Sequence, residues 1–170
     1  MTDHPMSIRT ASPTDCPTVA DIYAHYVTTS VATFDTEARS ADGWRSKLEA
    51  VRSAGRPFLV AVDHDDRVLG FSYLSPFRDR AAYAHTCEHT VYVAPGLERR
   101  GVGSALVSAM LAAARDTDVR EILALIALPG EGSLTLHRRH GFVEAGVLRR
   151  VGFKFDKWID VAILQYSLVR

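Results

Sequence analysis

The stretch that decides the fold is Cys-Glu-His-Thr-Val-Tyr-Val at 87–93, followed after a short break by Glu-Arg-Arg-Gly-Val-Gly-Ser at 98–104. The first seven residues have the β-branched and aromatic content of a strand. The second contains two glycines, which let the backbone approach a ligand closely, and it opens a helix whose first amides have no partner within the helix. Because such a helix start binds phosphate groups, the sequence predicts the Glu88 carboxylate beside an anion-binding backbone.

Downstream, the apolar residues after Gly101 recur at three- and four-residue steps and predict one helix face. The run from 122 to 128 is apolar throughout and long enough for one buried strand. The expected elements are a helix at 102–113, a strand at 122–128, a short helix at 133–140 closed by Gly141, and a last strand at 161–168.

Upstream, Ser12 and Pro13 are typical of a helix start, and apolar residues at helical spacing continue the pattern to Val27. The expected elements are a strand at 8–10, this first helix, a second helix from 40 toward 54, and a hairpin of strands at 58–62 and 68–74. With the downstream elements, they predict an α/β fold: a mixed, mostly antiparallel central sheet with helices on both faces.

The length of 170 residues suits one domain, 1–170, with a core at about 7–168. Twenty basic and twenty acidic side chains cancel, so we expect neither nucleic acid nor a membrane as partner. Two cysteines, Cys16 and Cys87, cannot build a disulfide framework, and no arginine-led apolar leader or long apolar run precedes Ser7. We therefore expect a cytoplasmic protein.

The glycine-bearing loop lacks the lysine of a nucleoside-triphosphate loop and the third glycine of a dinucleotide fingerprint. Arg99 and Arg100 add positive charge that favours a phosphate ligand of another kind. Plain turn chemistry also accounts for a lone Gly-x-Gly at a helix start, so the spacing alone leaves both interpretations open.

The loop resembles motif A of the GCN5-related N-acetyltransferase (GNAT) superfamily, whose members bind the pyrophosphate of acetyl-CoA there. Three further patterns resemble its phosphinothricin and methionine sulfoximine N-acetyltransferase subfamily, in the same order and at the same spacings, over residues 7–168. They are Glu88 to Val93, Ser133-x-x-Leu136-His137-x-x-x-Gly141-Phe142, and Gly152-x-Lys154-x-x-x-Trp158-x-Asp160-Val161.

This resemblance implies the GNAT fold and an acetyl-CoA-dependent enzyme, with no metal and as a homodimer. The implied reaction acetylates the α-amino group of a small amino-acid analogue (phosphinothricin, methionine sulfoximine or methionine sulfone) by direct transfer in a ternary complex, with detoxification as the role. It implies cofactor contacts by Val91, Tyr92 and Val93 to pantetheine, by Arg99, Arg100, Gly101, Val102, Gly103 and Ser104 to the pyrophosphate, and by Ser133.

Two positions depart from the family pattern. Glu98 stands where glutamine or arginine is usual, and an acid is unfavourable near a pyrophosphate unless it turns to solvent. The loop after the 122–128 strand reads Leu-Pro-Gly-Glu-Gly at 128–132, without the common asparagine that helps to hold pantetheine.

Glu88 lies in an apolar, threonine-rich strand, where burial would raise its carboxyl pKa into a range useful for a general base. A salt-bridged acid on an edge strand is the alternative. The resemblance implies that Glu88 deprotonates the substrate ammonium, directly or through water, and that His137 is a general acid or a second base; a structural histidine fits equally. Cys87 and His89 alternate to the opposite face, which disfavours a thiol nucleophile.

The segment from Phe77 to Tyr83 carries Arg78 and Arg80 and would suit a substrate carboxylate. Arginine binds carboxylate, phosphinate or sulfonyl oxygens by paired hydrogen bonds. Solvated surface charge is the alternative. The resemblance adds Ile126, Ala127 and Leu128 near substrate and pantetheine, and Phe34 in the pocket wall. It also leaves Lys154, Trp158 and Asp160 either in the site or at a dimer interface, and a core tryptophan with a surface ion pair is the alternative.

Two other functions remain open. An acetyltransferase for protein N-termini or polyamines shares every motif except the substrate loop, and polyamines favour acids there rather than Arg78 and Arg80. A CoA-binding sensor without turnover is a different class, to which the departures at Glu98 and Gly130 point.

Overall fold

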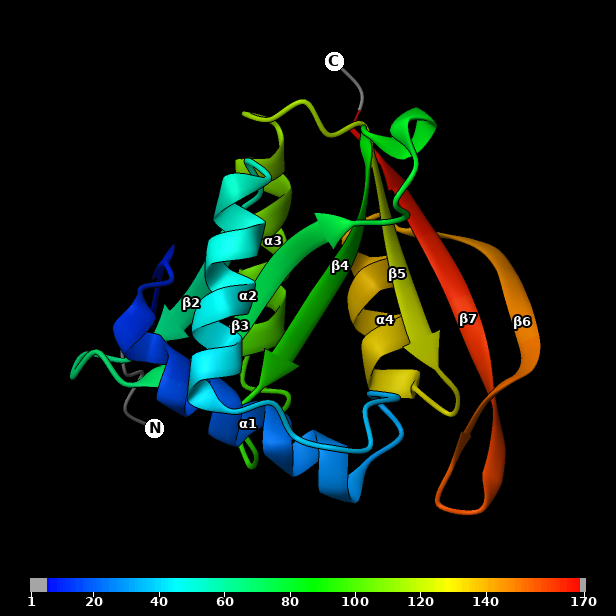
Figure 1. The fold of residues 1–170 in the computed structure, drawn as a ribbon, viewed down its shortest axis with the longest axis horizontal. Coiled ribbons are helices and arrows are strands. Elements are labelled where there is room, and N and C mark those ends of the chain that lie inside the picture. The colour runs from blue at the N-terminus through cyan, green and yellow to red at the C-terminus, as the bar shows by residue number, and fades with distance from the viewer. Residues whose placement is uncertain (1–5, 169–170) are drawn as a thin grey trace.

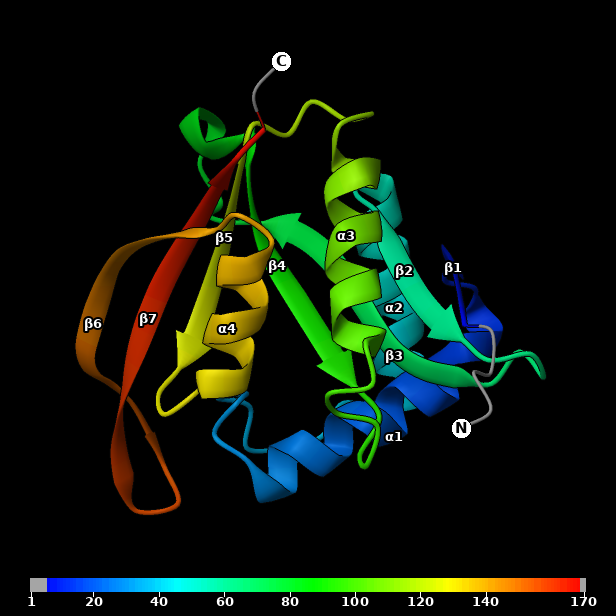
Figure 2. The same ribbon diagram turned by 180° about the vertical axis from the view of Figure 1, so that it is seen from behind.

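A seven-stranded sheet lies between two pairs of helices in the computed structural model, which describes residues 6–168 (Figures 1 and 2). The strand order is β1-β2-β3-β4-β5-β7-β6, and every neighbouring pair is antiparallel except β4 and β5. The elements are β1 (Ser7–Thr10), a 3-10 turn (Pro13–Asp15), α1 (Cys16–Thr29), α2 (Ala41–Ser53), β2 (Phe58–Val62), β3 (Val68–Pro76), a second 3-10 turn (Ala81–Tyr83), β4 (Thr86–Val93), α3 (Val102–Ala114), β5 (Glu121–Ala127), α4 (Glu131–Arg139), β6 (Val143–Lys154) and β7 (Lys157–Ser167).

The two faces of the sheet carry different cores. Helices α1 and α2 cover one face, where the fully buried ring of Trp44 packs edge-on against Phe71, 5.2 Å between ring centroids, and against Tyr23. Helices α3 and α4 cover the other face, where the core is aliphatic and includes Leu106 and Met110 (Figure 2). Because strand side chains alternate between faces, each side chain of β4 points toward one of these two cores.

The parallel pair β4 and β5 separates along its length. Pairing is confined to residues 86–88 of β4 and 121–123 of β5, whereas β4 stays paired with β3 as far as Val93. The two arrows spread from a common end in Figure 1. From His89 onward, the edge of β4 that faces β5 therefore has no strand partner.

The fold class is the one that the sequence predicts, and each expected helix and strand is found within a few residues of its predicted bounds, except at the C-terminal end. Strand β6 was not predicted, and β7 begins at Lys157 rather than near 161. Much of β6 is exposed and its pairing with β7 shifts register twice, between Glu144 and Gly146 and between Leu148 and Gly152. An edge strand interrupted in this way lacks the alternating pattern that marks a strand.

None of the helices in the described part of the chain has both the length and the apolar character of a membrane span.

Candidate active site

Glu88 lies at the point where β4 and β5 part. It is the last residue of β4 paired with β5, opposite Leu123, and it also pairs with Ser75 of β3. Its side chain is half-buried on the α1/α2 face, while Cys87 and His89 are buried on the α3/α4 face. The alternation expected from the sequence therefore separates the carboxylate from the thiol.

The surroundings of Glu88 favour its protonated form. Burial raises the pKa of the Glu88 carboxyl above its usual value, and the positive charges of Arg78 and Lys47 oppose that shift without cancelling it. A carboxylate with a raised pKa is a stronger base once it is ionised. This position suits a group that takes a proton from an incoming ammonium.

Lys47 brings a cation from α2 to the same place. Its Nζ lies 5.0 Å from the centroid of the Tyr73 ring, and burial lowers the pKa of this ammonium, as does the charge of Arg39, while Glu88 opposes the shift. Cations from two elements, α2 and the loop after β3, thus act on one half-buried carboxylate.

The loop between β3 and β4 holds the predicted substrate residues. Phe77 and Tyr83 pack edge to face, with centroids 5.5 Å apart, and the Arg78 guanidinium lies 4.6 Å from the centroid of the Phe77 ring. Arg78, Arg80 and Tyr83 line one shallow depression together with Asp79. Of the two arginines, Arg78 is the one whose charge acts on Glu88.

Phe34 lies in the loop between α1 and α2, which lines a second depression over residues 34–39. A Cβ at Gly152 of β6 would stand 2.2 Å from the Phe34 ring, so the ring packs directly on that glycine. Lys154 Nζ donates to the carbonyl oxygens of Ser30 and Thr33, both at 2.9 Å. The β6–β7 hairpin therefore positions the loop that carries Phe34, and this gives Lys154 a positioning role.

The open edge of β4 contains the residues expected to hold pantetheine. Val91 and Val93 pack into the α3/α4 core, and Tyr92 packs into the aromatic core of the other face. The Val93 carbonyl oxygen accepts a hydrogen bond of 2.7 Å from Tyr26. Backbone groups on the β5 side of this edge are left for a ligand that lies along the strand.

The start of α3 follows immediately. Gly101 has φ 86°, a left-handed conformation that suits glycine, and Arg99 has φ 61°. The Ala105 amide donates to the Gly101 carbonyl oxygen at 2.9 Å, so the helical bonds begin there and the amides of 101–104 precede them. Gly103 has another reason to be glycine, because a Cβ there would lie 3.2 Å from Leu136 of α4.

Three further loop residues are accounted for. Glu98 is exposed, and its charge acts on the Tyr26 hydroxyl, whose pKa is raised mainly by burial, so this acid turns toward α1 and solvent. Arg100 is exposed as well. Ser104 Oγ lies 2.8 Å from Nε2 of His140, which links the start of α3 to the end of α4.

His137 is 2% exposed, and both of its nitrogens are engaged. Nδ1 lies 2.8 Å from the Ser133 carbonyl oxygen and 3.4 Å from the Ser133 hydroxyl, and Nε2 lies 3.0 Å from Nδ1 of His89. Burial lowers the pKa of the His137 imidazole, and the charge of His140 adds to this against the Ser133 hydrogen bond. In this arrangement neither nitrogen is free to donate a proton to a leaving thiolate.

Ile126 and Ala127 end β5 on the far side of the gap, and Leu128 follows them. A Cβ at Gly130 would lie 2.5 Å from the Ala127 carbonyl oxygen and 2.7 Å from Ile126 Cγ2, so the backbone folds too tightly for any other residue there. Leu128 N–H donates to the Asp160 carbonyl oxygen at 2.9 Å. The departure from the family pattern at Gly130 thus has a steric reason.

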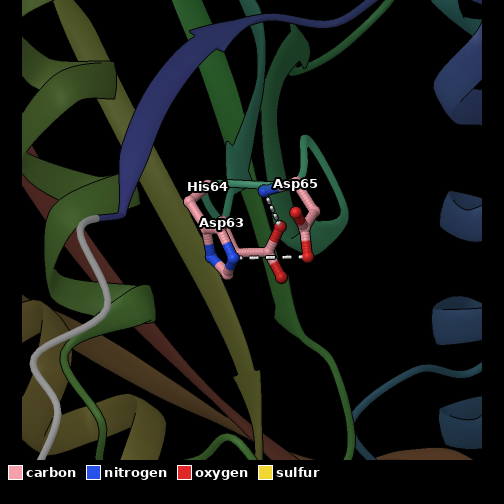
Figure 3. Close-up of side chains that lie close together, drawn as sticks. All are labelled: Asp63, His64 and Asp65. Atoms are coloured by element: carbon pink, nitrogen blue, oxygen red, sulfur yellow. Dashed lines mark hydrogen bonds and ion pairs between the residues drawn. The ribbon is translucent and has the colours of Figure 1, made fainter.

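One cluster of possible metal ligands lies outside this site, in the β2–β3 turn (Figure 3). His64 and Asp65 form an ion pair of 3.3 Å, and Asp63 Oδ1 accepts the amides of Asp65 and Arg67, each at 2.9 Å. These contacts are ordinary turn chemistry and give no reason to assign a metal.

Sequence reasoning missed Lys47, Arg39 and the hydrogen bonds of His89. Lys47 follows the buried Trp44 by three residues and precedes the buried Val51 by four, so a lysine at this phase borders the core. This helical spacing was the sequence signal that could have identified Lys47. The contacts of His89 in β4 are made to β3 and α4, and no local sequence pattern predicts them.

The splayed parallel pair, the anion-binding helix start and the half-buried carboxylate together define an acyl-CoA-dependent N-acyltransferase. The comparisons identify the family. The model of the acetyltransferase (GNAT) family matches residues 19–142, and the chain belongs to this family. It is an N-acetyltransferase, and acetyl-CoA is its co-substrate.

Several relatives resemble the chain over most of its length. The phosphinothricin N-acetyltransferase of Alcaligenes faecalis is 38% identical over 163 residues, covering 95% of this chain and 82% of that protein. The L-methionine sulfoximine/L-methionine sulfone acetyltransferase of Salmonella typhimurium is 30% identical, covering 96% and 95%. The crystal structure of a phosphinothricin acetyltransferase from Sinorhizobium meliloti in complex with acetyl-CoA superposes with a TM-score of 0.92 at 31% identity, covering 96% of this chain and 88% of that one.

Proposed function

We propose that this enzyme acetylates the α-amino group of a small amino-acid analogue, with phosphinothricin, methionine sulfoximine and methionine sulfone as the leading candidates. The observation that carries the proposal is the half-buried Glu88 carboxylate at the parting of β4 and β5, flanked by the charges of Lys47 and Arg78. One of these two positive charges balances the Glu88 carboxylate. The other is available to bind a substrate carboxylate, phosphinate or sulfonyl oxygen.

In the proposed reaction, Glu88 removes a proton from the substrate ammonium, directly or through water. The freed amine attacks the thioester carbonyl carbon, the C–S bond breaks with its electron pair on sulfur, and the second proton lost by the nitrogen neutralises the thiolate. Transfer is direct, because Cys87 faces away from Glu88. Most of the acceleration then comes from holding the two reactants together.

Acetyl-CoA would lie with its pantetheine along the open edge of β4 at Val91, Tyr92 and Val93 and its pyrophosphate on the amides at the start of α3. Support comes from the absence of a strand partner there within residues 6–168 and from the left-handed backbone at Arg99 and Gly101. The exposed side chains of Arg99 and Arg100 add positive charge, and Ser133 borders the gap from α4.

The amine substrate would lie on the α1/α2 side, with its acidic group toward Arg78 and Lys47. Phe34, Phe77 and Tyr83 would form apolar walls around it, Arg80 the outer rim, and the backbone of 126–128 the far side. The names of the relatives support this substrate class, since they specify phosphinothricin, methionine sulfoximine and methionine sulfone.

The test is a screen of the purified protein with acetyl-CoA against amino acids and their sulfone, sulfoximine and phosphinate analogues, with release of free thiol as the readout. We expect turnover with at least one analogue that keeps both the α-amino and the acidic group, and none when the amine is removed. Turnover with polyamines or N-terminal peptides alone would refute the proposed substrate class. The two cations that act on Glu88, Lys47 and Arg78, disfavour polyamines as substrates.

We also propose a homodimer. Its support is a set of apolar side chains on the β6–β7 hairpin that are half or more exposed: Trp158 59%, Phe153 56%, Val151 53% and Phe155 51%. Patches of this kind mark interaction surfaces. The hairpin also packs on the Phe34 loop through Gly152 and Lys154, so association there would act on the substrate side of the site.

We propose that the enzyme is cytoplasmic and that its role is detoxification. Both cysteines are buried free thiols, as is usual in a reducing compartment. Acetylation of the α-amine removes its positive charge and so destroys the zwitterionic character by which amino-acid analogues are recognised.

A further inference from the structure

A chain of buried polar groups connects β3 to α4 through β4. Ser72 Oγ lies 2.8 Å from Nε2 of His89, His89 Nδ1 lies 3.0 Å from Nε2 of His137, and His137 Nδ1 lies 2.8 Å from the Ser133 carbonyl oxygen. The three side chains are 0%, 6% and 2% exposed, respectively. Buried polar groups without partners are costly, and here every ring nitrogen has one.

The carbonyl at one end fixes the direction of the whole chain. A carbonyl oxygen only accepts, so His137 carries its proton on Nδ1 and, when neutral, accepts at Nε2. His89 must then donate from Nδ1 and accept at Nε2, which leaves the Ser72 hydroxyl as the donor. Both imidazoles are thereby held in the Nδ1–H tautomer.

The ionisable neighbours do not favour charge on either ring. Burial lowers the pKa of His89 well below its usual value, and the charges of His137 and His140 add to the effect. For His137, burial and the charge of His140 lower the pKa, opposed by the Ser133 hydrogen bond. The remaining ring contact is with Phe142, which carries no charge.

The chain of hydrogen-bonded side chains crosses the gap between β4 and β5. His89 is the first residue of β4 beyond the last β4–β5 pair at Glu88, whereas α4 follows β5 and packs on the far side of the gap (Figure 2). The imidazoles therefore join the two halves of the sheet at the narrow end of the gap, directly behind the proposed base.

We propose that Ser72 and His89 are positioning residues for acetyl transfer: they hold His137 as a neutral acceptor and fix α4 to β4 at the width that the thioester needs. The inference rests on the proposed placement of acetyl-CoA in the gap. In this role His137 does not protonate the departing thiolate. The proton comes from the attacking nitrogen or from water.

Tautomer assignment tests the chain directly. In the protein with ¹⁵N-labelled histidine, two-bond ¹⁵N–¹H correlation spectra at neutral pH should show His89 and His137 as neutral imidazoles with the proton on Nδ1. Ser72→Ala removes the donor to His89 Nε2, so the His89 Nε2 signal should shift while the proton stays on Nδ1, where the contact with His137 holds it. A proton on Nε2 of His137 in the unaltered protein would overturn the inference.

Kinetics test the positioning role. His89→Asn places an amide NH₂ near the former Nδ1 and keeps the donor to His137, whereas His89→Leu removes it. We expect His89→Leu to lower kcat by about ten- to a hundredfold with little change in KM for acetyl-CoA, and His89→Asn to restore most of kcat. His85→Asn is the matched control, since His85 Nδ1 likewise has a hydrogen-bond partner, the Asp118 carbonyl oxygen at 2.8 Å, but lies away from the gap.

Unaltered kcat in His89→Leu would overturn the positioning role. If that variant does not fold, Ser72→Ala decides, with the same expected fall in kcat and the same refutation. Addition of acetyl-CoA should shift the His89 and His137 signals. Unchanged signals would overturn the placement of acetyl-CoA and this inference with it, whereas shifted signals with unaltered kcat would overturn the inference alone.

Discussion

Single side chains decide the chemistry of this site. Glu88 combines half-burial with two nearby cations, and the balance leaves its carboxyl pKa raised. Lys47 and Arg78 act on it from different elements, so the charge balance at this proposed base can be altered one residue at a time.

Glu88→Gln should leave acetyl-CoA binding unchanged and remove most turnover at neutral pH, because the amide cannot accept the ammonium proton. A fall in kcat of about a hundred- to ten-thousandfold is the range for a lost general base. The measurements are thiol release for kcat and calorimetric titration for acetyl-CoA binding. Full activity in this variant would remove the assigned role.

The pH dependence follows from the direction of the shift. Glu88 acts as a base only when ionised, so activity is present above its pKa and is lost as pH falls through it. Because burial raises that pKa, the acid limb of kcat/KM should lie above that of an exposed glutamate. Lys47→Met removes a charge that lowers the pKa, so the limb should move to higher pH and KM for the amine substrate should rise.

The control for Lys47→Met is Arg67→Met, which removes a positive charge from the exposed β2–β3 turn. It should leave both the acid limb and KM in place. An acid limb at the same pH in Lys47→Met and the unaltered enzyme would show that Lys47 does not act on the base.

At the scale of elements, the start of α3 and the packing of β6 on the α1–α2 loop set the two halves of the site. Gly101 is favoured by its left-handed backbone conformation, whereas Gly103 is favoured by its close contact with Leu136. The two glycines of one motif thus have different physical reasons, and substitution should separate them.

Gly101→Ala forces a left-handed residue with a Cβ, which costs about 1–2 kcal/mol or moves the loop. We expect KM for acetyl-CoA to rise while KM for the amine substrate is unchanged, measured in the thiol-release assay. Gly103→Ala is the comparison: its added Cβ lies 3.2 Å from Leu136 Cδ2, so a small shift of that side chain accommodates it and the effect should be smaller. Equal effects would contradict the separate roles.

Gly152→Ala should act on the opposite half. The added Cβ would lie 2.2 Å from the Phe34 ring, so the ring and its loop must move. We expect KM for the amine substrate to rise and KM for acetyl-CoA to stay the same. Gly146→Ala on the same strand, where no atom lies within 4 Å of the new Cβ, controls for general effects on β6.

At the scale of the whole molecule, the exposed apolar side chains of the β6–β7 hairpin predict self-association. Trp158→Ser combined with Phe153→Ser removes the two rings that pack together at 5.0 Å. We expect the mass from light scattering to fall from that of a dimer to that of a monomer, with KM for the amine substrate increased through the Phe34 loop. A monomeric mass for the unaltered protein would refute the proposed dimer.

The sequence by itself determined the α/β class, the helices and strands up to α4 and the last strand, because each of these carries a local periodicity of apolar residues. It also determined that Glu88 and Cys87 face opposite sides, since alternation along a strand is a local property. The side-chain contacts that surround Glu88 were not accessible in this way.

Only the tertiary structure decided where β4 and β5 part, that Lys47 and Arg78 both act on Glu88, and that Ser72, His89 and His137 form one chain. Each of these joins elements separated by many residues, and their relation depends on strand order and on the angle between strands. The exposed, bulged β6 likewise becomes a strand through its pairing with β7 rather than through its own pattern. Contacts between distant segments are set by packing of the whole, and no window of sequence contains them.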